Sequence, residues 1–304
     1  METYYPEGYI INTAENRATL TSVKGLEDAA AKQKIVEATV TLCDYEHNLI
    51  VDLGDIKGII PREEGAVGIR EGTVRDIALI SRVGKAVSFV IDKIDHDKKT
   101  AVLSRRAAQE KCQSEYVSSL VPGDIINAKI THLENFGAFC DIGCGIIALM
   151  PIDAISVSRI SHPSDRFSPG DMIKAAIKSV DELGRVSLTQ RELLGTWEEN
   201  AAEFIQGETV EGIVRTVEDY GIFIELAPNL AGLAEPRDDV EAGQKVSVYI
   251  KSIIKEKMKL KLIIIDVFDA EKRSAPIKYF IDSGHIDRWQ YSPDGCNKII
   301  ETEF

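Results

Sequence analysis

Two pairs of aromatic residues with the same spacing are the part of the sequence best suited to binding a ligand. Phe136 and Phe139 form one pair, Tyr220 and Phe223 form the other, and a glycine follows the first ring of each. An aromatic face can stack on an unpaired nucleic-acid base, which contributes roughly 1 to 3 kcal/mol per base. A glycine at this place lets a backbone or a ligand approach closely. The spacing therefore indicates two stacking platforms.

Strand alternation predicts which side chains around these rings face outward, because successive residues of a strand point to opposite faces. The alternate apolar residues that we expect to be buried are Ala138, Cys140, Ile142, Ile222, Ile224 and Leu226. This assignment places Phe139 and Asp141 outside in one strand and Phe223 and Glu225 outside in the other. The alternative is that both phenylalanines cover a barrel edge or pack on a neighbouring domain.

Each aromatic pair lies within a longer internal repeat. Residues 121–191 and 207–265 share a glycine-acid start, an alternating strand, the aromatic turn, and later a glycine-led strand, a turn and a closing strand. A weaker copy over 35–106 carries a long insertion between Arg62 and Arg82. About five short strands in roughly 60 to 70 residues are typical of a small closed barrel.

The segments around the repeats predict mixed structure. The extension 1–34 is expected to form a hairpin, from 9–13 and 17–21, and then a short helix near 26–34. Residues 107–120 and 192–206 are predicted to be helical linkers. The extension 266–304 keeps several aromatic residues, among them Phe268, Tyr279, Phe280, Trp289 and Tyr291, so at least part of it should fold onto the body. The predicted fold class is mainly β, with three tandem five-stranded barrels joined by short helices.

The repeats resemble the S1 RNA-binding domain, a member of the OB-fold class, and the array resembles the ribosomal protein S1 family of bacteria. The resemblance is strong over 122–191, good over 207–264 and weak over 35–106. The motifs that carry it are Asn135-Phe-Gly-Ala-Phe-Cys-Asp-Ile-Gly, Gly170-Asp-Met-Ile-Lys-Ala-Ala-Ile-Lys-Ser-Val-Asp and Gly184-Arg-Val-Ser-Leu-Thr.

The resemblance implies which residues line an RNA face. In the family these are the two aromatics, an Asp after the fourth strand and an Arg that opens the fifth. By position they correspond to Phe136, Phe139, Asp181 and Arg185 in the second repeat, and to Tyr220, Phe223, Lys255 and Lys259 in the third.

The sequence departs from the family pattern at two places. A proline replaces the common third-strand His in all three repeats, at Pro61, Pro151 and Pro236. The first repeat has His47 and Ile50 at the aromatic positions, so its stacking platform is lost. We expect the first repeat to serve as a protein-docking or spacer module.

Basic residues gather near the end of the third repeat. Alternation sends Lys257, Lys259 and Lys261 to one side, opposite Met258, Leu260 and Leu262. This side is either a track for RNA phosphates or a solvated outer face. Further polar or basic side chains could reach a bound strand: those of Arg159, His162 and Arg166 in one loop, and that of His132, outward just before the turn.

The overall charge limits the kind of nucleic-acid binding. The 304 residues hold 36 Lys and Arg against 49 Asp and Glu, which gives a formal charge of −13. A polybasic protein that coats DNA is excluded because the chain has no global positive field. No signal peptide and no membrane span are expected, so the predicted location is the cytoplasm. The five cysteines include no C-x-x-C pair and are interpreted as reduced structural thiols.

Signals for an enzyme or a metal site are weak. Asp95-His-Asp-Lys-Lys has the composition of an ordinary hairpin turn and no nucleophile motif accompanies it. Zinc bound by Cys140, Cys144 and His132 is disfavoured, because alternation buries Cys140 while His132 points outward. We predict no catalytic residue, no metal and no cofactor.

The sequence thus predicts a protein that binds single-stranded RNA through its second and third repeats. The resemblance implies association with the small ribosomal subunit and a role with mRNA in translation. One alternative is an RNA regulator or RNA-decay accessory that does not join the ribosome. Another is a protein-interaction scaffold whose aromatic faces are buried between domains.

Overall fold

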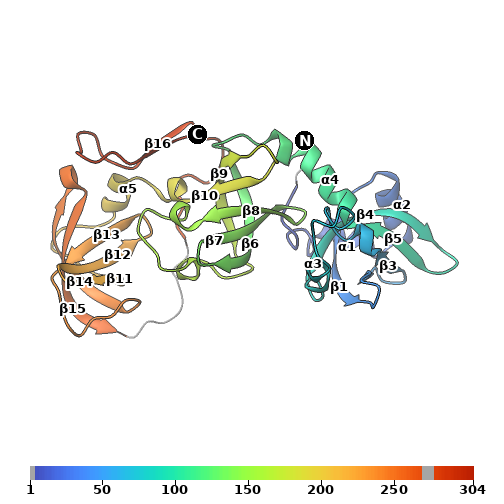
Figure 1. The fold of residues 1–304 in the computed structure, drawn as a ribbon, viewed down its shortest axis with the longest axis horizontal. Coiled ribbons are helices and arrows are strands. Elements are labelled where there is room, and N and C mark those ends of the chain that lie inside the picture. The colour runs from blue at the N-terminus through green and yellow to red at the C-terminus, as the bar shows by residue number, and fades with distance from the viewer. Residues whose placement is uncertain (1–3, 269–276) are drawn as a thin grey trace. The chain divides into compact units, whose positions relative to one another are not determined.

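Three closed five-stranded β-barrels make up most of the protein (Figure 1). The structure is a computed structural model that describes residues 4–268 and 277–304. The mainly β fold class predicted from the sequence is confirmed. Backbone contacts divide the chain into two compact units. Unit 1 contains the residues up to Leu120 together with Asn127–Lys129 and Asp141–Ile147, and unit 2 contains Val121–Ile126, Ile130–Cys140 and the described residues from Ala148 onward.

Each barrel takes five consecutive strands. The strands of the first barrel are β1 (Val36–Cys43), β2 (Leu49–Asp52), β3 (Lys57–Ile60), β4 (Ala86–Asp95) and β5 (Thr100–Ser104). Those of the second are β6 (Ile125–Glu134), β7 (Gly137–Gly143), β8 (Ile146–Pro151), β9 (Met172–Val180) and β10 (Val186–Thr189). Those of the third are β11 (Thr209–Glu218), β12 (Gly221–Ala227), β13 (Leu230–Ala234), β14 (Lys245–Ile254) and β15 (Lys259–Phe268).

The three barrels have the same strand order. Within each, the first three strands form an antiparallel meander, and the third strand then pairs in parallel with the fifth. A bulge interrupts the first strand at the same place in two barrels, between Val40 and Leu42 and between Val214 and Thr216. A bulge bends a strand and increases its twist, which lets five short strands close on themselves.

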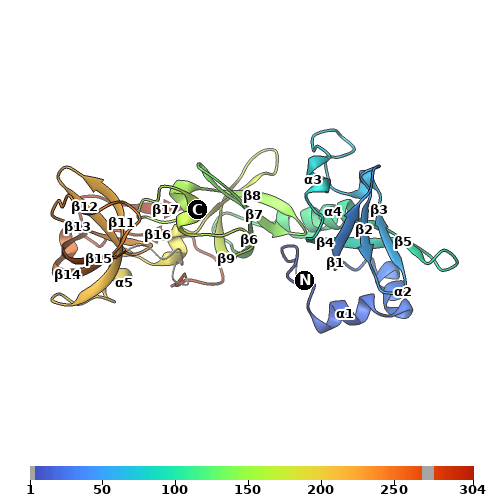
Figure 2. The same cartoon turned by 90° about the horizontal axis from the view of Figure 1, so that it is seen from below.

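Alternating apolar residues fill the barrel interiors. In the first barrel Val40, Val51, Phe89 and Leu103 are all buried in one cluster. Helix α2 (Val23–Ala31) adds Leu26 to that cluster, and Figure 2 shows this helix beside the barrel. Burying such side chains contributes roughly 1.5 to 3 kcal/mol each, which is the main term that stabilises these small domains.

The predicted hairpin in the N-terminal extension is wrong. Helix α1 (Ala14–Leu20) occupies this stretch, and α2 follows it directly. The Thr13 and Ser22 side chains accept hydrogen bonds from Asn16 N and Gly25 N, so each caps a helix start. The buried Asn16 amide also exchanges two hydrogen bonds with the backbone of Glu37 in β1. Short polar segments lack a clear period, so alternation alone misidentified them.

Short helical segments join the barrels and fill the insertion. After the first barrel come α4 (Arg105–Glu115) and a 3₁₀ turn, Val117–Ser119. After the second come a 3₁₀ turn, Arg191–Leu194, and α5 (Trp197–Ala201). The insertion of the first barrel holds α3 (Ile77–Ile80).

The described part of the C-terminal extension packs within unit 2. Ile286, Trp289 and Tyr291 are buried in the same apolar cluster as the third barrel. Strands β16 (Arg288–Gln290) and β17 (Glu301–Glu303) pair as a small hairpin. Residues 269–276 of the predicted extension lie outside the described residues.

The N-terminal segment of unit 1 buries charged groups. The Arg105 guanidinium donates two hydrogen bonds to the Glu7 carboxylate, of 2.6 and 3.1 Å, and Arg82 adds a third of 3.2 Å. Burial opposes ionisation of Glu7, but the charge and hydrogen bonds of Arg105 outweigh it and hold its pKa below the ordinary value. Burial and the nearby Glu7 charge raise the pKa of Asp141 to about 7.

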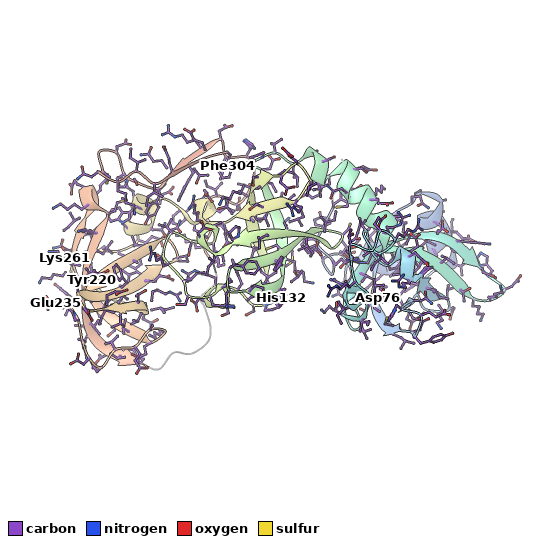
Figure 3. All side chains as sticks on the ribbon, viewed as in Figure 1. Asp76, His132, Tyr220, Glu235, Lys261 and Phe304 are labelled. Carbon is purple, nitrogen blue, oxygen red and sulfur yellow. The ribbon has the colours of Figure 1, made fainter. Side chains whose placement is uncertain are left out.

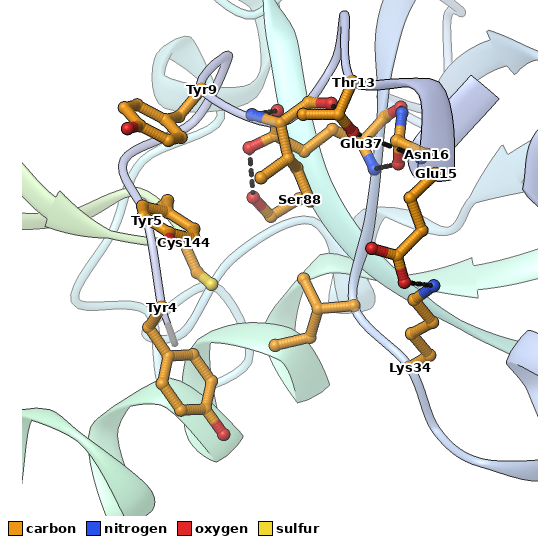
Figure 4. Close-up of a pocket in the computed structure, with 12 residues that line it drawn as sticks. Tyr4, Tyr5, Tyr9, Thr13, Glu15, Asn16, Lys34, Glu37, Ser88 and Cys144 are labelled. Carbon is orange, nitrogen blue, oxygen red and sulfur yellow. Dashed lines mark hydrogen bonds and ion pairs between the residues drawn. The ribbon is translucent and has the colours of Figure 1, made fainter. Parts of the chain in front are cut away.

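A cavity of about 400 Å³ lies beside this segment (Figure 4). The Glu37 carboxylate lines it and accepts hydrogen bonds from Ile10 N and Ser88 Oγ. Burial raises the pKa of Glu37 to about 7 in spite of these bonds. The stacked rings of Tyr5 and Tyr9, with centroids 4.3 Å apart, form the opposite wall.

The raised pKa of Glu37 predicts that acid stabilises unit 1. The folded form holds the proton up to about pH 7, whereas the unfolded carboxyl releases it near pH 4.5. The free energy of unfolding should therefore fall as pH rises from about 4.5 to about 7, with up to about 3 kcal/mol from Glu37. Urea unfolding at pH 5 and pH 8 measures the difference. The pH difference should shrink in Glu37→Gln and persist in the exposed control Glu71→Gln. An unchanged difference in Glu37→Gln would contradict the assignment.

Candidate nucleic-acid interface

The two aromatic pairs adopt the same geometry. The rings of Phe136 and Phe139 meet edge to face with centroids 6.0 Å apart and planes at 88°. Those of Tyr220 and Phe223 meet at 6.1 Å and 85°. The first ring of each pair is well exposed, 56% for Phe136 and 69% for Tyr220, while the second is half-buried. Each pair therefore offers two differently oriented ring faces at the barrel surface.

A third ring extends the platform of the second barrel. The His132 imidazole lies over Phe139 with centroids 6.2 Å apart and planes at 26°. Its Nε2 atom contacts a carboxylate oxygen of Glu134 at 2.6 Å, which keeps the ring in place at the end of β6. His132 is thus brought beside Phe139, and its side chain is 63% exposed.

The glycine between the two aromatic residues of each pair lies against the backbone of the neighbouring strand. A Cβ atom on Gly137 would lie 2.4 Å from the Met150 carbonyl oxygen, and one on Gly221 would lie 2.8 Å from that of Ala234. Contacts so short are not tolerated between carbon and a backbone oxygen. The sequence explained each glycine by the close approach of either a backbone or a ligand. In the structure it is the backbone of the neighbouring strand, β8 or β13, that lies close to the glycine.

Strand register places a lysine beside the platform of the third barrel. Phe223 in β12 pairs with Leu233 in β13, and Leu233 pairs with Lys261 in β15. Neighbouring strands lie about 4.8 Å apart, so Phe223 and Lys261 stand roughly 10 Å apart on the same outer face. Figure 3 shows Tyr220 and Lys261 near each other at the surface of this barrel. The spacing suits a base stacked on the ring with a phosphate at the ammonium group.

The predicted lysines differ in their surroundings. Lys259 and Lys261 alternate with buried Leu260 in β15 and are exposed. Lys257 is exposed too, but it lies in the preceding 3₁₀ turn, and left-handed Met258 breaks the alternation between it and β15. The ammonium of Lys255 is paired with Glu198, whose hydrogen bond and charge raise its pKa. Of the three lysines predicted to share one side of a strand, only Lys259 and Lys261 therefore do so.

In the second barrel Asp181 shapes the turn that presents Arg185. The Asp181 carboxylate accepts hydrogen bonds from the backbone N–H groups of Leu183 and Arg185 and from Arg185 Nε, at 2.9, 2.8 and 2.7 Å. These bonds, led by that from the Arg185 backbone, lower the pKa of Asp181. The Arg185 side chain remains 76% exposed. Asp181 is thus a turn residue, and Arg185 is the group that can reach a ligand.

The corresponding face of the first barrel is aliphatic. Register aligns Leu42, Ile50, Ile59 and Val102 across four strands, the same row that contains Phe223, Leu233 and Lys261 in the third barrel. His47, at the other aromatic position, has positive φ and lies 3.7 Å from a carboxylate oxygen of Asp76. The first barrel therefore has neither stacked rings nor a lysine on this row.

Three residues expected at the surface are buried. Asp141 is 2% exposed because its carboxylate accepts a hydrogen bond from Glu7 N. Glu225 is 5% exposed because Arg166 and Arg215 both bind it. Arg166 is itself buried in this ion pair, so its guanidinium is not available to a bound strand. Alternation put Asp141 and Glu225 on the outer barrel face correctly, but other segments cover that face. Arg159, in the same loop as Arg166, is exposed.

Sequence reasoning missed the residues that act across strands. Alternation predicted that Lys261 faces outward but could not show that it shares a row with Phe223, because that depends on the parallel pairing of β13 with β15. Arg215 and Asn229 were not singled out either. Arg215 binds Glu225 through two hydrogen bonds and Asn229 is fully buried. No local motif marks either residue.

Within the described residues, no group of three or more His, Cys, Asp or Glu side chains is placed to hold a metal ion. Cys140 is fully buried whereas the His132 side chain is 63% exposed, so these two do not face one site. No helix in the part of the chain that the structure describes is long and apolar enough to cross a membrane.

Comparison with known protein families identifies the first two barrels. The family model of the S1 RNA binding domain matches residues 30–106 and 120–191. These two barrels belong to the S1 RNA-binding domain family. The match includes the first barrel, where the resemblance seen in the sequence was weakest. The third barrel lies outside the matched ranges, but it has the strand order and the aromatic pair of the second S1 domain.

The chain is also similar to longer proteins over most of its length. It is 29% identical over 274 residues to the small ribosomal subunit protein bS1 of Staphylococcus aureus, a match that covers 84% of this chain and 68% of that protein. The bS1 protein of Staphylococcus epidermidis is 28% identical with the same coverage. A solved multidomain protein with nucleic acid binding domains from Streptococcus pneumoniae is 14% identical, covers 77% of this chain and 74% of its own, and has a TM-score of 0.26.

The position of Lys259 and Lys261 predicts how salt affects RNA binding. Each phosphate contact on a single strand contributes about 0.7 to the slope of log K against log salt. Replacing both lysines by alanine should lower the slope by about 1.4, measured by fluorescence anisotropy with oligouridylate from 50 to 300 mM salt. Lys24→Ala with Lys32→Ala removes the same charge from helix α2 and the residue that follows it, and should leave the slope unchanged. An equal decrease of the slope in both double variants would show that RNA binding depends on the net charge of the chain and not on the position of Lys259 and Lys261.

Proposed function

We propose that the protein holds single-stranded RNA, and mRNA in particular, by stacking bases on its second and third barrels and by a few phosphate contacts. The observation that carries the proposal is the pair of equivalent edge-to-face aromatic platforms. In the third barrel Lys261 shares a row with Phe223, and in the second barrel we expect the exposed Arg185 to supply a cation to the same strand. Ring faces accept any base, so recognition is tolerant of sequence.

The charge of the chain agrees with weak, reversible binding. A formal charge of −13 opposes long-range attraction of a polyanion, so affinity must come from local contacts. Stacking on exposed rings such as Phe136 and Tyr220 does not depend on net charge. RNA would therefore bind at the platforms and dissociate readily as salt rises.

We further propose that this binding serves translation in the cytoplasm, in association with the small ribosomal subunit and without enzymatic activity. The support is the similarity to bS1 proteins over 84% of the chain. The aliphatic row of the first barrel favours a separate task for that domain, such as docking on a protein or spacing the RNA-binding barrels. An RNA regulator or RNA-decay accessory that does not join the ribosome is the second candidate.

Removing the rings tests the platforms directly. Phe139→Ala combined with Phe223→Ala should weaken poly(U) binding by at least about tenfold, because each stacked base contributes roughly 1 to 3 kcal/mol. Filter binding with the full chain measures the change. Tyr45→Ala removes a ring that is 90% exposed in the first barrel, so it serves as the control and should bind normally. A double variant with unchanged affinity would favour the protein-interaction scaffold.

Association with ribosomes separates the two RNA-related functions. If the chain acts on the ribosome, it should co-sediment with small subunits in sucrose gradients of lysate and dissociate from them at high salt. The Phe139→Ala and Phe223→Ala variant should still co-sediment if the first barrel provides the contact. A chain that stays at the top of the gradient, yet binds poly(U), would instead support the free regulator.

A further inference from the structure

One loop of the second barrel begins at its aromatic platform. Residues 152–171 connect β8 to β9, and the Ile152 N–H donates a 3.0 Å hydrogen bond to the carbonyl oxygen of Phe136. The start of the loop is therefore fixed to the backbone of the more exposed ring of the pair.

The same loop contacts the outer face of the third barrel before it returns to β9. Its Arg166 donates a hydrogen bond to the Glu225 carboxylate, and its Asp165 lies 3.6 Å from Arg215. Glu225 follows Phe223 by two residues in β12 and shares its outer face, so the two are about 7 Å apart. The loop thus abuts the edge of the second platform.

Asn229 holds this arrangement from the third barrel. Its Oδ1 accepts a hydrogen bond from Val157 N in the loop, at 2.9 Å, and its Nδ2 donates to the carbonyl oxygens of Arg191 and Gly195 in the linker. The Tyr291 hydroxyl of the C-terminal segment donates to the Asn229 carbonyl at 2.6 Å. One buried residue therefore joins loop, linker and C-terminal segment.

The surface between the two platforms can interact with a polyanion. Arg159 is exposed in the loop, and the His162 ring nearby is in contact with the Ser164 hydroxyl at 2.7 Å. The Glu225 and Asp165 carboxylates are paired with arginines, whereas Asp153 in the loop and Glu235 in the third barrel are exposed. A phosphate chain would thus meet the Arg159 guanidinium on a path that avoids these two exposed acids.

From these contacts we infer that one RNA strand runs from the Phe136–Phe139 platform across loop 152–171 to the Tyr220–Phe223 platform. Arg166 is a positioning residue, because its ion pair with Glu225 fixes the loop to the third barrel beside Phe223, together with the hydrogen bonds of Asn229. The inference rests on the proposed function and adds that the two barrels bind one strand as a bivalent site. Fixed spacing raises the effective concentration of the second platform once the first is occupied.

The length dependence of binding tests the inference. A 15-nucleotide oligouridylate offers about ten times more registers than a 5-nucleotide one, so independent platforms give about a tenfold gain in affinity. Bivalent binding should raise the gain to at least about 100-fold in the full chain. In Arg166→Met the gain should return to about tenfold while 5-mer affinity stays unchanged. Glu225 keeps both hydrogen bonds from Arg215 in this variant, so no buried carboxylate is left unpaired.

A surface variant gives an independent check. Arg159→Ala should lower the salt slope for the 15-mer by about 0.7 without changing binding of the 5-mer. Arg288→Ala, an exposed arginine of the C-terminal hairpin, is the matched control and should change neither. A wild-type gain of only about tenfold, or a gain that Arg166→Met does not alter, would overturn the inference. Failure of both oligomers to bind would instead contradict the proposed function.

Discussion

Parallel pairing of the third and fifth strands closes each barrel, and the composition of its outer face depends on this pairing. In the third barrel it sets Lys261 beside Leu233 and hence in line with Phe223. In the first barrel the same pairing joins Ile59 to Val102 and produces an aliphatic row. One backbone constraint therefore yields a row with an aromatic ring and a lysine or a row of aliphatic side chains, according to which residues the register brings together.

Two of the arginines form buried ion pairs and so add little to the positive charge of the surface. The guanidinium groups of Arg105 and Arg166 are nearly fully buried and neutralise Glu7 and Glu225. A buried charge is costly unless it is paired and hydrogen-bonded, and each of these carboxylates is held by a second guanidinium as well, Arg82 for Glu7 and Arg215 for Glu225. These arginines stabilise contacts inside each unit and do not contribute to the surface field. Few cations therefore remain exposed beside the two aromatic pairs, in keeping with the formal charge of −13.

The two terminal extensions have similar physical roles. The N-terminal segment covers Asp141 and Glu37 in unit 1 and raises the pKa of both carboxyl groups to about 7. The C-terminal segment adds Trp289 and Tyr291 to the core of unit 2. In both units, polar residues that a lone barrel would leave in water become buried and hydrogen-bonded. A domain taken out of this chain would expose them, so full-length variants are the better test.

Much of the fold and of the site could be predicted from local pattern. Period-two alternation and the repeated glycine-aromatic turn determined three barrels, the outward direction of Phe139 and Phe223, and the turn that presents Arg185. Local sequence pattern does not show which other segments of the chain cover the outer face of a barrel. The burial of Glu225 and Arg166, the row that Lys261 shares with Phe223, and the helix in place of a hairpin at 14–20 were decided by tertiary structure. The physical reason is that alternation specifies a side of a strand, whereas register and coverage depend on residues distant in the chain.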